Sequence, residues 1–444
     1  MEERGEFLVL GGGVAGLAAG VELGERAIVL ERESRPGGLV VSDEFEGYWF
    51  DRVLHLLHFP DEALQRRIQE IVGDDLAPCP PVAWIECAGG NVRYPFQLNV
   101  GGLEEGSRNR CLADFARASF GADSGEPPAD YEDLLVRAFG REMCEQFFLP
   151  YNRKMWRRPL RSLAPMGFVW NIHRPSFEEV LDGAFRPNLP RETYNTRAFY
   201  PRPPAGAPVR GMEVLSRSLA ARVPRLRLDT EVLAIDPRVR TVSARHEGRE
   251  LRFGYDRRCL STMPLPQTMR ACAGAPEELV RAAEALPRNV VFSVAFAIRG
   301  PRPAAPGHWR YHTDERVPFT RLVYMAEFDP LTAPADGWGL MAEVTHPAEE
   351  PWPGEEELCA SARDGLRRVG ALGEGQEIVA ERVFVADPAY VVFTPESREV
   401  VRRCTEYLAA AGVDTVGRYG RWEYSSMAQV MADGFRWAAE AAAP

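Results

Sequence analysis

Three glycines near the start of the chain, Gly11, Gly13 and Gly16, have the spacing of a turn that binds a dinucleotide. They follow an apolar run at residues 7–10 and open a run of small helix-forming residues, and a second apolar run ends in Glu31. In such a unit the first glycine permits the tight turn, the second lets backbone approach a pyrophosphate, and the third lets helix and strand pack closely. The helix N-terminus attracts phosphate oxygens, and Glu31 is placed to bind ribose hydroxyls. The sequence therefore predicts a strand–turn–helix unit that binds a dinucleotide.

The rest of the chain divides into helical and strand-like stretches around this unit. Residues 131–139 have the apolar spacing of a helix, whereas residues 291–298 and 339–344 have that of strands. Two short runs joined by a glycine pair, at 84–87 and 91–94, predict a hairpin. These patterns predict an α/β protein: a Rossmann-like nucleotide-binding fold with a helical insertion and a second, antiparallel-sheet domain. The expected domains are a nucleotide-binding domain (1–78, 200–285 and 379–444), a helical domain (100–199) and a sheet domain (79–99 and 286–378).

The composition is that of an ordinary globular enzyme. The chain has 444 residues, 45% of them hydrophobic, and a net charge of -11, which argues against nucleic acid or a membrane surface as partner. No apolar run reaches the ~20 residues of a membrane-spanning helix, and the charged N-terminal stretch is unlike a signal peptide. The eight cysteines include no CxxC pair and are expected to be reduced thiols. These features predict a cytoplasmic protein and leave its oligomeric state open.

Short sequence blocks along nearly the whole chain resemble those of UDP-galactopyranose mutases, and the eukaryotic-type sequences more than the short bacterial ones. The blocks are PGGL (36–39), GYWFD (47–51), YPFQ (94–97), PYNRKMW (150–156), STMP (261–264), PFTR (318–321) and GRYGRWEY (417–424). The YPFQ and PYNRKMW blocks separate this family from the wider group of amine and protoporphyrinogen oxidases. The resemblance implies an FAD-type Rossmann fold and an isomerase that interconverts the pyranose and furanose forms of a nucleotide-bound hexose.

The resemblance also implies which residues form the site. The base of the nucleotide would be held by Tyr94, Gln97, Phe147, Asn152 and Trp156, although a lone aromatic such as Phe147 is more often a core residue. The diphosphate would be held by Arg321, which is also a catalytic candidate, and by Tyr311, Tyr390 and Tyr424. Beyond the first glycine turn and Glu31, the cofactor would be held by Gly37, Gly38, Val232 and Gly434. Both uridine and guanosine remain candidates for the base.

This sequence departs from the family where the flavin ring should lie. The family has a pair of small residues between an aspartate and a histidine, whereas here Val53 and Leu54 stand between Asp51 and His55. Their side chains project into the space expected for the ring, and protein interiors have no spare volume. The family's second catalytic arginine falls on Asn171, with Arg174 about one helical turn further on as a candidate replacement.

A metal ion could replace the flavin in such a site. The flavin supplies the nucleophile in this family, so without it a divalent cation is expected to stabilise the departing diphosphate. The predicted ligands of Mn²⁺ or Mg²⁺ are His55, His58 and Asp51, and His55 is also a catalytic candidate. The sequence thus favours a flavin-independent, metal-dependent mutase acting on a UDP- or GDP-sugar. The alternatives are a conventional FAD-dependent mutase, a flavin amine or protoporphyrinogen oxidase, and a non-catalytic nucleotide-sugar binding protein.

Overall fold

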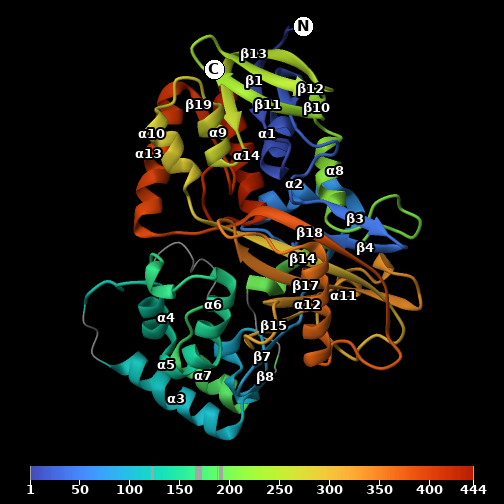
Figure 1. Ribbon diagram of the computed structural model, residues 1–444, viewed down its shortest axis with the longest axis vertical. Helices are drawn as coiled ribbons and strands as arrows, with labels where there is room; N and C mark the ends of the chain where they lie inside the picture. Colours follow the sequence, from blue (N-terminus) through green and yellow to red (C-terminus); the bar gives the residue numbers. More distant parts are fainter. Residues whose placement is uncertain (1, 122–124, 166–172, 188, 190–193, 444) are drawn as a thin grey trace.

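Two large sheets and a group of helices make up the molecule (Figure 1). The computed structural model describes residues 2–121, 125–165, 173–187, 189 and 194–443. The N-terminus and C-terminus both lie at the end of the molecule formed by the first sheet, and the second sheet and the helical domain lie at the other end (Figure 1). No helix among the described residues is long and apolar enough to cross a membrane.

The first sheet contains the predicted strand–turn–helix unit. In spatial order its strands are β10 (Leu226–Arg227), β2 (Ala27–Leu30), β1 (Glu2–Leu10), β13 (Arg249–Ser261), β12 (Thr241–His246) and β11 (Thr230–Asp236), with β19 (Val413–Thr415) beside β13. The strands β10, β2, β1, β13 and β19 run parallel, whereas β12 is antiparallel to β13 and β11.

Helices cover both faces of this first sheet because its central strands are apolar on both sides. In β1, Phe7 and Val9 point into one core and Leu8 and Leu10 into another. The first core includes α1 (Val14–Leu23), α2 (Glu62–Val72), α8 (Glu213–Ala220) and α14 (Met427–Ala442). The other includes α9 (Leu265–Ala271), α10 (Glu277–Glu284) and α13 (Pro395–Ala411).

The second sheet is long and almost entirely antiparallel. Its strands are β18 (Glu377–Val391), β14 (Arg288–Arg299), β17 (Gly337–Pro347), β16 (Arg321–Tyr324), β15 (Trp309–His312), β7 (Ala83–Cys87) and β8 (Gly90–Arg93). The pairing of β15 with β7 is parallel, which the prediction of an antiparallel sheet did not include. Because β18 pairs with β14 along its length, this strand belongs to the second sheet, beyond the boundary at residue 378 placed from the sequence.

The helical domain and two small sheets complete the fold. The helices of the domain are α3 (Glu105–Phe120), α4 (Tyr131–Phe139), α5 (Arg141–Met143), α6 (Leu149–Trp156) and α7 (Phe177–Phe185), with a π-helical turn (Cys144–Phe148) leading into α6. One small sheet pairs β3 (Ser42–Phe45) with β4 (Tyr48–Asp51). The other has β9 (Ala198–Pro201) between β5 (Leu57–His58) and β6 (Leu76–Pro78). The predicted helix at 131–139 and the predicted hairpin are confirmed, and so is the α/β fold class.

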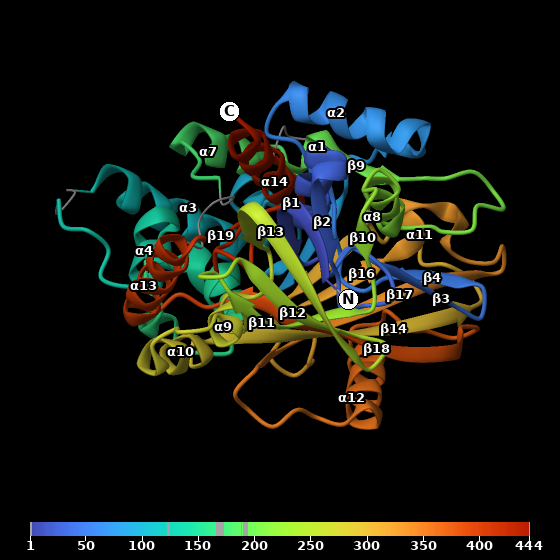
Figure 2. The ribbon, with the colours of Figure 1, turned by 90° about the horizontal axis from the view of Figure 1, so that it is seen from above.

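A single core joins the two large sheets. It contains Phe7 and Val9 of the first sheet together with Ala295, Val323 and Met341 of the second. The opposite face of the second sheet is covered by α12 (Glu355–Arg368), which lies on the far side from α1 and α14 (Figure 2). The second sheet therefore presents one face to the nucleotide-binding domain, and polar side chains on that face are enclosed.

Lys154 on α6 fastens the helical domain to the second sheet. It is the only lysine among the 53 lysine and arginine residues of the chain. Its buried ammonium donates to three backbone oxygens, those of His312 (3.0 Å), Asp314 (2.8 Å) and Phe319 (2.7 Å). An ammonium group has three N–H donors, so each one has a partner and the hairpin between β15 and β16 is held against α6.

Replacing Lys154 with arginine should destabilise the protein despite keeping the charge. A planar guanidinium cannot reach the same three carbonyl groups from one point, so at least one buried oxygen loses its donor. We expect a loss of about 2–3 kcal/mol in the free energy of unfolding, measured by urea denaturation. The exposed neighbour Arg153 provides the control, since Arg153→Lys should leave the midpoint unchanged. Equal stability of Lys154→Arg and the wild type would contradict this role.

Candidate functional site

The glycine turn has the geometry that the sequence predicts. Gly11 has a φ of 104°, and a Cβ there would lie 2.5 Å from Thr262 Oγ1. A Cβ on Gly16 would overlap the carbonyl oxygen of Gly11, whereas one on Gly13 would meet nothing within 4 Å. Backbone is therefore packed closely on one side of the turn and open on the other, which leaves room for a bound group beside Gly13.

No side chain caps the N-terminus of α1. Its N-cap, Gly13, makes no side-chain capping bond, and the first turn carries no acidic residue. Buried helix N-termini need an acceptor, and a pyrophosphate is one. Gly37 forms a bridge with Gly13 and donates to the oxygen of Gly12 (2.8 Å), which brings the loop containing Gly37 and Gly38 beside the turn. These residues fit the pyrophosphate of a dinucleotide.

Glu31 lies at the end of β2, where a ribose would be bound. Its Oε2 accepts from the backbone N–H of Gly12 (2.6 Å) and its Oε1 from that of Glu33 (2.9 Å). Burial raises the pKa of this carboxyl, and the two backbone hydrogen bonds oppose that shift. Each oxygen keeps further acceptor capacity, so the carboxylate can also receive ribose hydroxyls.

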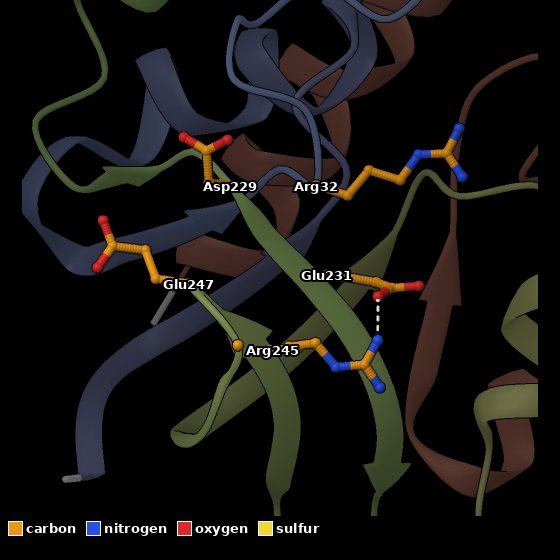
Figure 3. Close-up of a pocket in the computed structure, with 6 residues that line it drawn as sticks. Arg32, Asp229, Glu231, Arg245 and Glu247 are labelled. Atoms are coloured by element: carbon orange, nitrogen blue, oxygen red, sulfur yellow. Dashed lines mark hydrogen bonds and ion pairs between the residues drawn. The ribbon is translucent and has the colours of Figure 1, made fainter.

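A charged groove adjoins Glu31 on the outside of the first sheet (Figure 3). The groove is lined by Arg32, Asp229, Glu231, Arg245, Glu247 and Gly248. Arg245 and Glu231 form an ion pair across it (3.0 Å). Val232 follows Glu231 at a bulge in β11, where the register with β12 shifts. The groove is open and mixed in charge, and it lies at the outer edge of the predicted nucleotide site.

Gly434 lies against the helix that follows the glycine turn, and its predicted role in cofactor binding stays a prediction. It lies in the middle of α14, and a Cβ there would overlap the backbone oxygen of Ala15 on α1. The glycine is therefore needed for close packing of the two helices.

Arg321 lies in a row of polar side chains across the second sheet. On β16 it pairs in register with Tyr311 of β15 on one side and with Glu343 of β17 on the other, and Glu343 pairs with Ser293 of β14. Side chains directly opposite one another point to the same face of a sheet. Their neighbours two residues along, Val323 and Met341, lie in the shared core, so the row faces the nucleotide-binding domain.

Glu343 fixes the guanidinium of Arg321. Its Oε2 accepts from Arg321 Nε (2.7 Å) and lies 2.5 Å from Arg321 Nη2, while its Oε1 accepts from the backbone N–H of Leu54 (3.3 Å). The Glu343 side chain is 3% exposed and that of Arg321 16%. Removal of either partner would leave a buried charge unpaired, which is costly. The sequence did not single out Glu343 as a partner of Arg321, because their pairing depends on the register of two strands.

Stacked aromatic rings lie next to this row. Phe147 stacks on Tyr151 (ring centroids 5.3 Å apart, planes 24° apart), and Tyr151 meets Tyr311 edge to face at 5.1 Å. Tyr94, which the sequence also placed in the site, lies 5.9 Å from Tyr311. Three of the predicted base- and phosphate-binding residues, Tyr94, Phe147 and Tyr311, are therefore brought together.

The polar residues predicted to read the base are occupied by contacts within the protein. Asn152 Oδ1 accepts from Trp156 Nε1 (3.0 Å) and Tyr131 Oη (3.1 Å), and its amide donates to the oxygen of Phe148 (2.7 Å). Gln97 is buried and donates to the backbone oxygen of His173 (2.7 Å). Asn152 and Trp156 thus shape α6, and a role in reading the base remains a prediction.

Tyr390 and Tyr424 lie together, as expected for a shared site, and Arg418 joins them. The two tyrosine rings are stacked 6.1 Å apart with their planes 9° apart. The guanidinium of Arg418 lies 4.2 Å from the ring of Tyr424 and 5.7 Å from that of Tyr390. Arg418 stands in the GRYGRWEY block but was not among the predicted site residues, because its sequence position alone does not distinguish it from surface arginines.

His55 lies near both Arg321 and Arg418. Burial, together with the charges of Arg418 and Arg321, lowers the pKa of His55 to about 4. Its Nδ1 is buried without a hydrogen-bond partner. The imidazole is therefore neutral at physiological pH and has an unused nitrogen.

The predicted metal site is not assembled. Within the described ranges, no group of three or more His, Cys, Asp or Glu side chains is placed to hold a metal ion. Asp51 instead accepts from Ser42 Oγ (2.6 Å), Tyr200 Oη (2.7 Å) and the backbone N–H of Met212 (2.8 Å). Burial raises the pKa of Asp51 to about 6, and these hydrogen bonds oppose the shift. Asp51 is thus a structural residue that ties β4 to α8.

Two further sequence predictions concern the segment that follows α6. Arg174 is exposed, two residues before Ser176, the N-cap of α7, and its catalytic role remains a prediction. Asn171 lies outside the described residues. All eight cysteines are free.

The fold and the nucleotide-binding turn define a flavoprotein-type architecture, and the comparisons identify its family. The model of flavin containing amine oxidoreductases matches residues 14–443, so the chain belongs to this family.

Several solved structures share this fold. Reduced UDP-galactopyranose mutase is 21% identical, with 98% of this chain and 93% of that chain covered and a TM-score of 0.87. The putative protoporphyrinogen oxidase from Exiguobacterium sp. 255-15 is 18% identical, with coverage of 99% and 98% and a TM-score of 0.72. A fatty acid isomerase from P. acnes is 14% identical, with coverage of 98% of each chain and a TM-score of 0.62.

Val53 and Leu54 occupy the segment where the resemblance to UDP-galactopyranose mutases led us to expect small residues. Val53 packs against Val291, Ala386 and Ala389 of the second sheet, and Leu54 packs against the shared core. If these side chains limit the space for a flavin ring, Val53→Gly/Leu54→Gly should bind more flavin than the wild type. The measurement is the ratio of flavin released on denaturation to protein. An unchanged ratio in a folded double variant would show that these side chains do not limit binding.

His55 should make stability depend on pH. The unfolded histidine has a pKa of about 6.5 and the folded one of about 4, so between these values the unfolded chain binds more protons. The free energy of unfolding therefore rises with pH in this window, by at most about 1.4 kcal/mol per pH unit for one histidine. His55→Gln should reduce that slope in urea denaturation between pH 4 and 6.5, whereas His173→Gln, at an exposed position, should not. Equal slopes in the two variants would contradict the burial of a neutral His55.

Proposed function

We propose that the protein interconverts the pyranose and furanose forms of a hexose carried on a nucleoside diphosphate, with FAD as its cofactor. The proposal rests on the contact between two surfaces that differ in chemistry, one polar and one aromatic. One is the row that contains Tyr311 and Arg321, and the other is the ring stack of Phe147 and Tyr151. Stacked rings suit a nucleobase, and an arginine beside phenols suits a diphosphate.

The charge of the site favours an anionic substrate over an amine. Arg321 and Arg418 both lie near His55, which is neutral. Two guanidinium groups repel a protonated amine and attract phosphate oxygens. This argues against amine oxidation, although the family contains amine oxidoreductases.

In the proposed reaction, Arg321 stabilises the charge that develops on the departing diphosphate. Cleavage of the bond between the anomeric carbon and the diphosphate leaves the electron pair on a phosphate oxygen. An arginine held in place by Glu343 needs no reorganisation to meet that charge. His55, neutral and with an unused nitrogen, is available to exchange a proton with a sugar hydroxyl.

The first turn and Glu31 would hold the adenosine diphosphate part of FAD. The open space at Gly13 and the uncapped N-terminus of α1 fit its pyrophosphate, and the Glu31 carboxylate fits its ribose. When bound, the reduced flavin supplies an electron pair for nucleophilic catalysis at the anomeric carbon. We propose FAD in preference to a metal ion because the described residues form no metal-binding cluster.

The proposal is tested by incubating the full-length protein with UDP- and GDP-hexoses, with and without a flavin reductant, and separating the pyranose and furanose forms by chromatography. We expect turnover with at least one nucleotide sugar under reducing conditions. No turnover with any of them, together with hydrogen peroxide production from an amine, would overturn the proposal.

Arg321→Ala should lower kcat/KM by about 10²–10³-fold, since it removes a donor aimed at developing charge. Arg363→Ala is the matched control, because Arg363 pairs with Glu381 beneath α12 on the opposite face of the same sheet. Its kcat/KM should equal that of the wild type. If Arg321→Ala turns over at the wild-type rate, Arg321 has no role in the reaction.

A further inference from the structure

Large apolar side chains are exposed where α3 and α7 lie side by side in the helical domain (Figure 1). Phe185 on α7 is 76% exposed, and Phe120, the last residue of α3, is 72% exposed. Leu181 is exposed one helical turn before Phe185, and Phe177, one turn earlier still, meets the ring of Phe120 edge to face at 5.3 Å. We call these four residues the α7 surface. A contiguous group of exposed apolar residues, unlike a single one, marks a binding surface.

The packing of α7 explains why its large side chains are left outside. The buried residues of this helix are Val180, Gly183 and Ala184. A Cβ on Gly183 would lie 2.2 Å from the backbone oxygen of Leu98, so the helix packs backbone to backbone against the turn that contains Leu98. Such a close approach leaves no room for a large side chain, and the large apolar residues of α7 form a stripe outside this contact.

The apolar stripe on α7 matches itself under a two-fold rotation. Phe177 and Phe185 are each four residues, about one helical turn, from Leu181. A two-fold axis that passes beside Leu181, perpendicular to the helix, would place Leu181 against its own copy and each phenylalanine ring against the other phenylalanine of the second helix. Symmetric contacts between identical chains require a surface that is complementary to itself in this way.

The charges at the two ends of α7 favour the same antiparallel arrangement. Glu178 and Glu179 stand in the first turn of the helix, and Arg186 stands at its C-cap. An antiparallel second copy brings the acidic end of one helix beside the basic end of the other, whereas a parallel copy would oppose like charges. The glutamates also argue against a lipid surface, because helices that lie on membranes carry basic residues on their polar face.

We propose that two copies of this chain associate through the α7 surface, with their α7 helices antiparallel and crossing at Leu181. A stable dimer buries about 800 Å² on each partner, whereas four apolar side chains cover on the order of 400 Å². The dimer is therefore a weak one, with an expected dissociation constant of about 10 µM or higher. The inference does not depend on the proposed function, since the α7 surface contains none of the residues assigned to the proposed site.

The inference is tested by the oligomeric state of the full-length protein, measured by analytical ultracentrifugation from about 1 to about 300 µM. We expect the wild type to pass from monomer to dimer over this range. Leu181→Glu and Leu181→Lys each oppose two like charges at the crossing point, so each variant alone should dimerise at least about 10-fold more weakly. A wild type that stays monomeric at every concentration would overturn the inference.

An equal mixture of Leu181→Glu and Leu181→Lys distinguishes this contact from one elsewhere on the molecule. The two chains place opposite charges at the crossing point, so the mixture should dimerise more strongly than either variant by itself. Because Leu181 is exposed, neither substitution should lower the unfolding temperature. A mixture that dimerises no more strongly than the separate variants, or unchanged dimers in both variants, would overturn the inference.

Val239→Glu is the matched control, because Val239 is 61% exposed in the turn between β11 and β12 of the first sheet. This substitution should leave the dimer unchanged, and equal weakening by it would show a general effect of added charge and overturn the inference. Flotation with vesicles of phosphatidylcholine and phosphatidylserine tests the other occupant. Vesicle binding that is lost in Leu181→Glu, from a wild type that forms no dimer, would assign the α7 surface to a membrane and overturn the inference.

Discussion

An arginine can remain charged between the two sheets of this protein because a carboxylate lies directly across from it on the next strand. The pair of Arg321 and Glu343 requires the register of β16 and β17, and Glu343 in turn holds the backbone of Leu54 in the loop after β4. One carboxylate thus links the sheet to the segment that contains Val53 and Leu54. Any displacement of this strand pair would move Arg321 and Leu54 together, because one carboxylate binds both of them, each through a different oxygen.

The predictions from the sequence succeeded where the determinants are local. The glycine turn, the helix after it and Glu31 stand within one stretch of chain, and their spacing alone defines their geometry. The α/β class followed from the same kind of local pattern. The predicted metal site failed because its residues depend on distant partners: Asp51 is saturated by donors from β3, β9 and the loop before α8. The pairing of Glu343 with Arg321 was not predicted for the same reason, since only the folded chain places the two residues side by side.

The proposed site lies where the helical domain, the second sheet and the segment after β19 meet. The rings of Phe147 and Tyr151 belong to the core of the helical domain, Arg321 belongs to the second sheet, and Arg418 follows the last strand of the first sheet. No one domain could form the site by itself. Contacts such as that of Asn289, whose amide donates to the backbone oxygens of Met155 (2.9 Å) and Trp156 (3.1 Å), therefore determine the relative positions of the functional groups.

Lys154 gives this contact between domains an unusual chemical property. Because Lys154 is the single lysine of the chain, the protein contains one side-chain primary amine, and it is 6% exposed. In the folded protein, reagents that acylate neutral amines would react with the amino terminus and not with the Lys154 side chain. Acylation of Lys154 adds the mass of one acyl group. That added mass would mark each molecule in which α6 has separated from the hairpin between β15 and β16. Lys154 is therefore an intrinsic probe for opening of the helical domain. It lies where that opening would separate the residues of the proposed site.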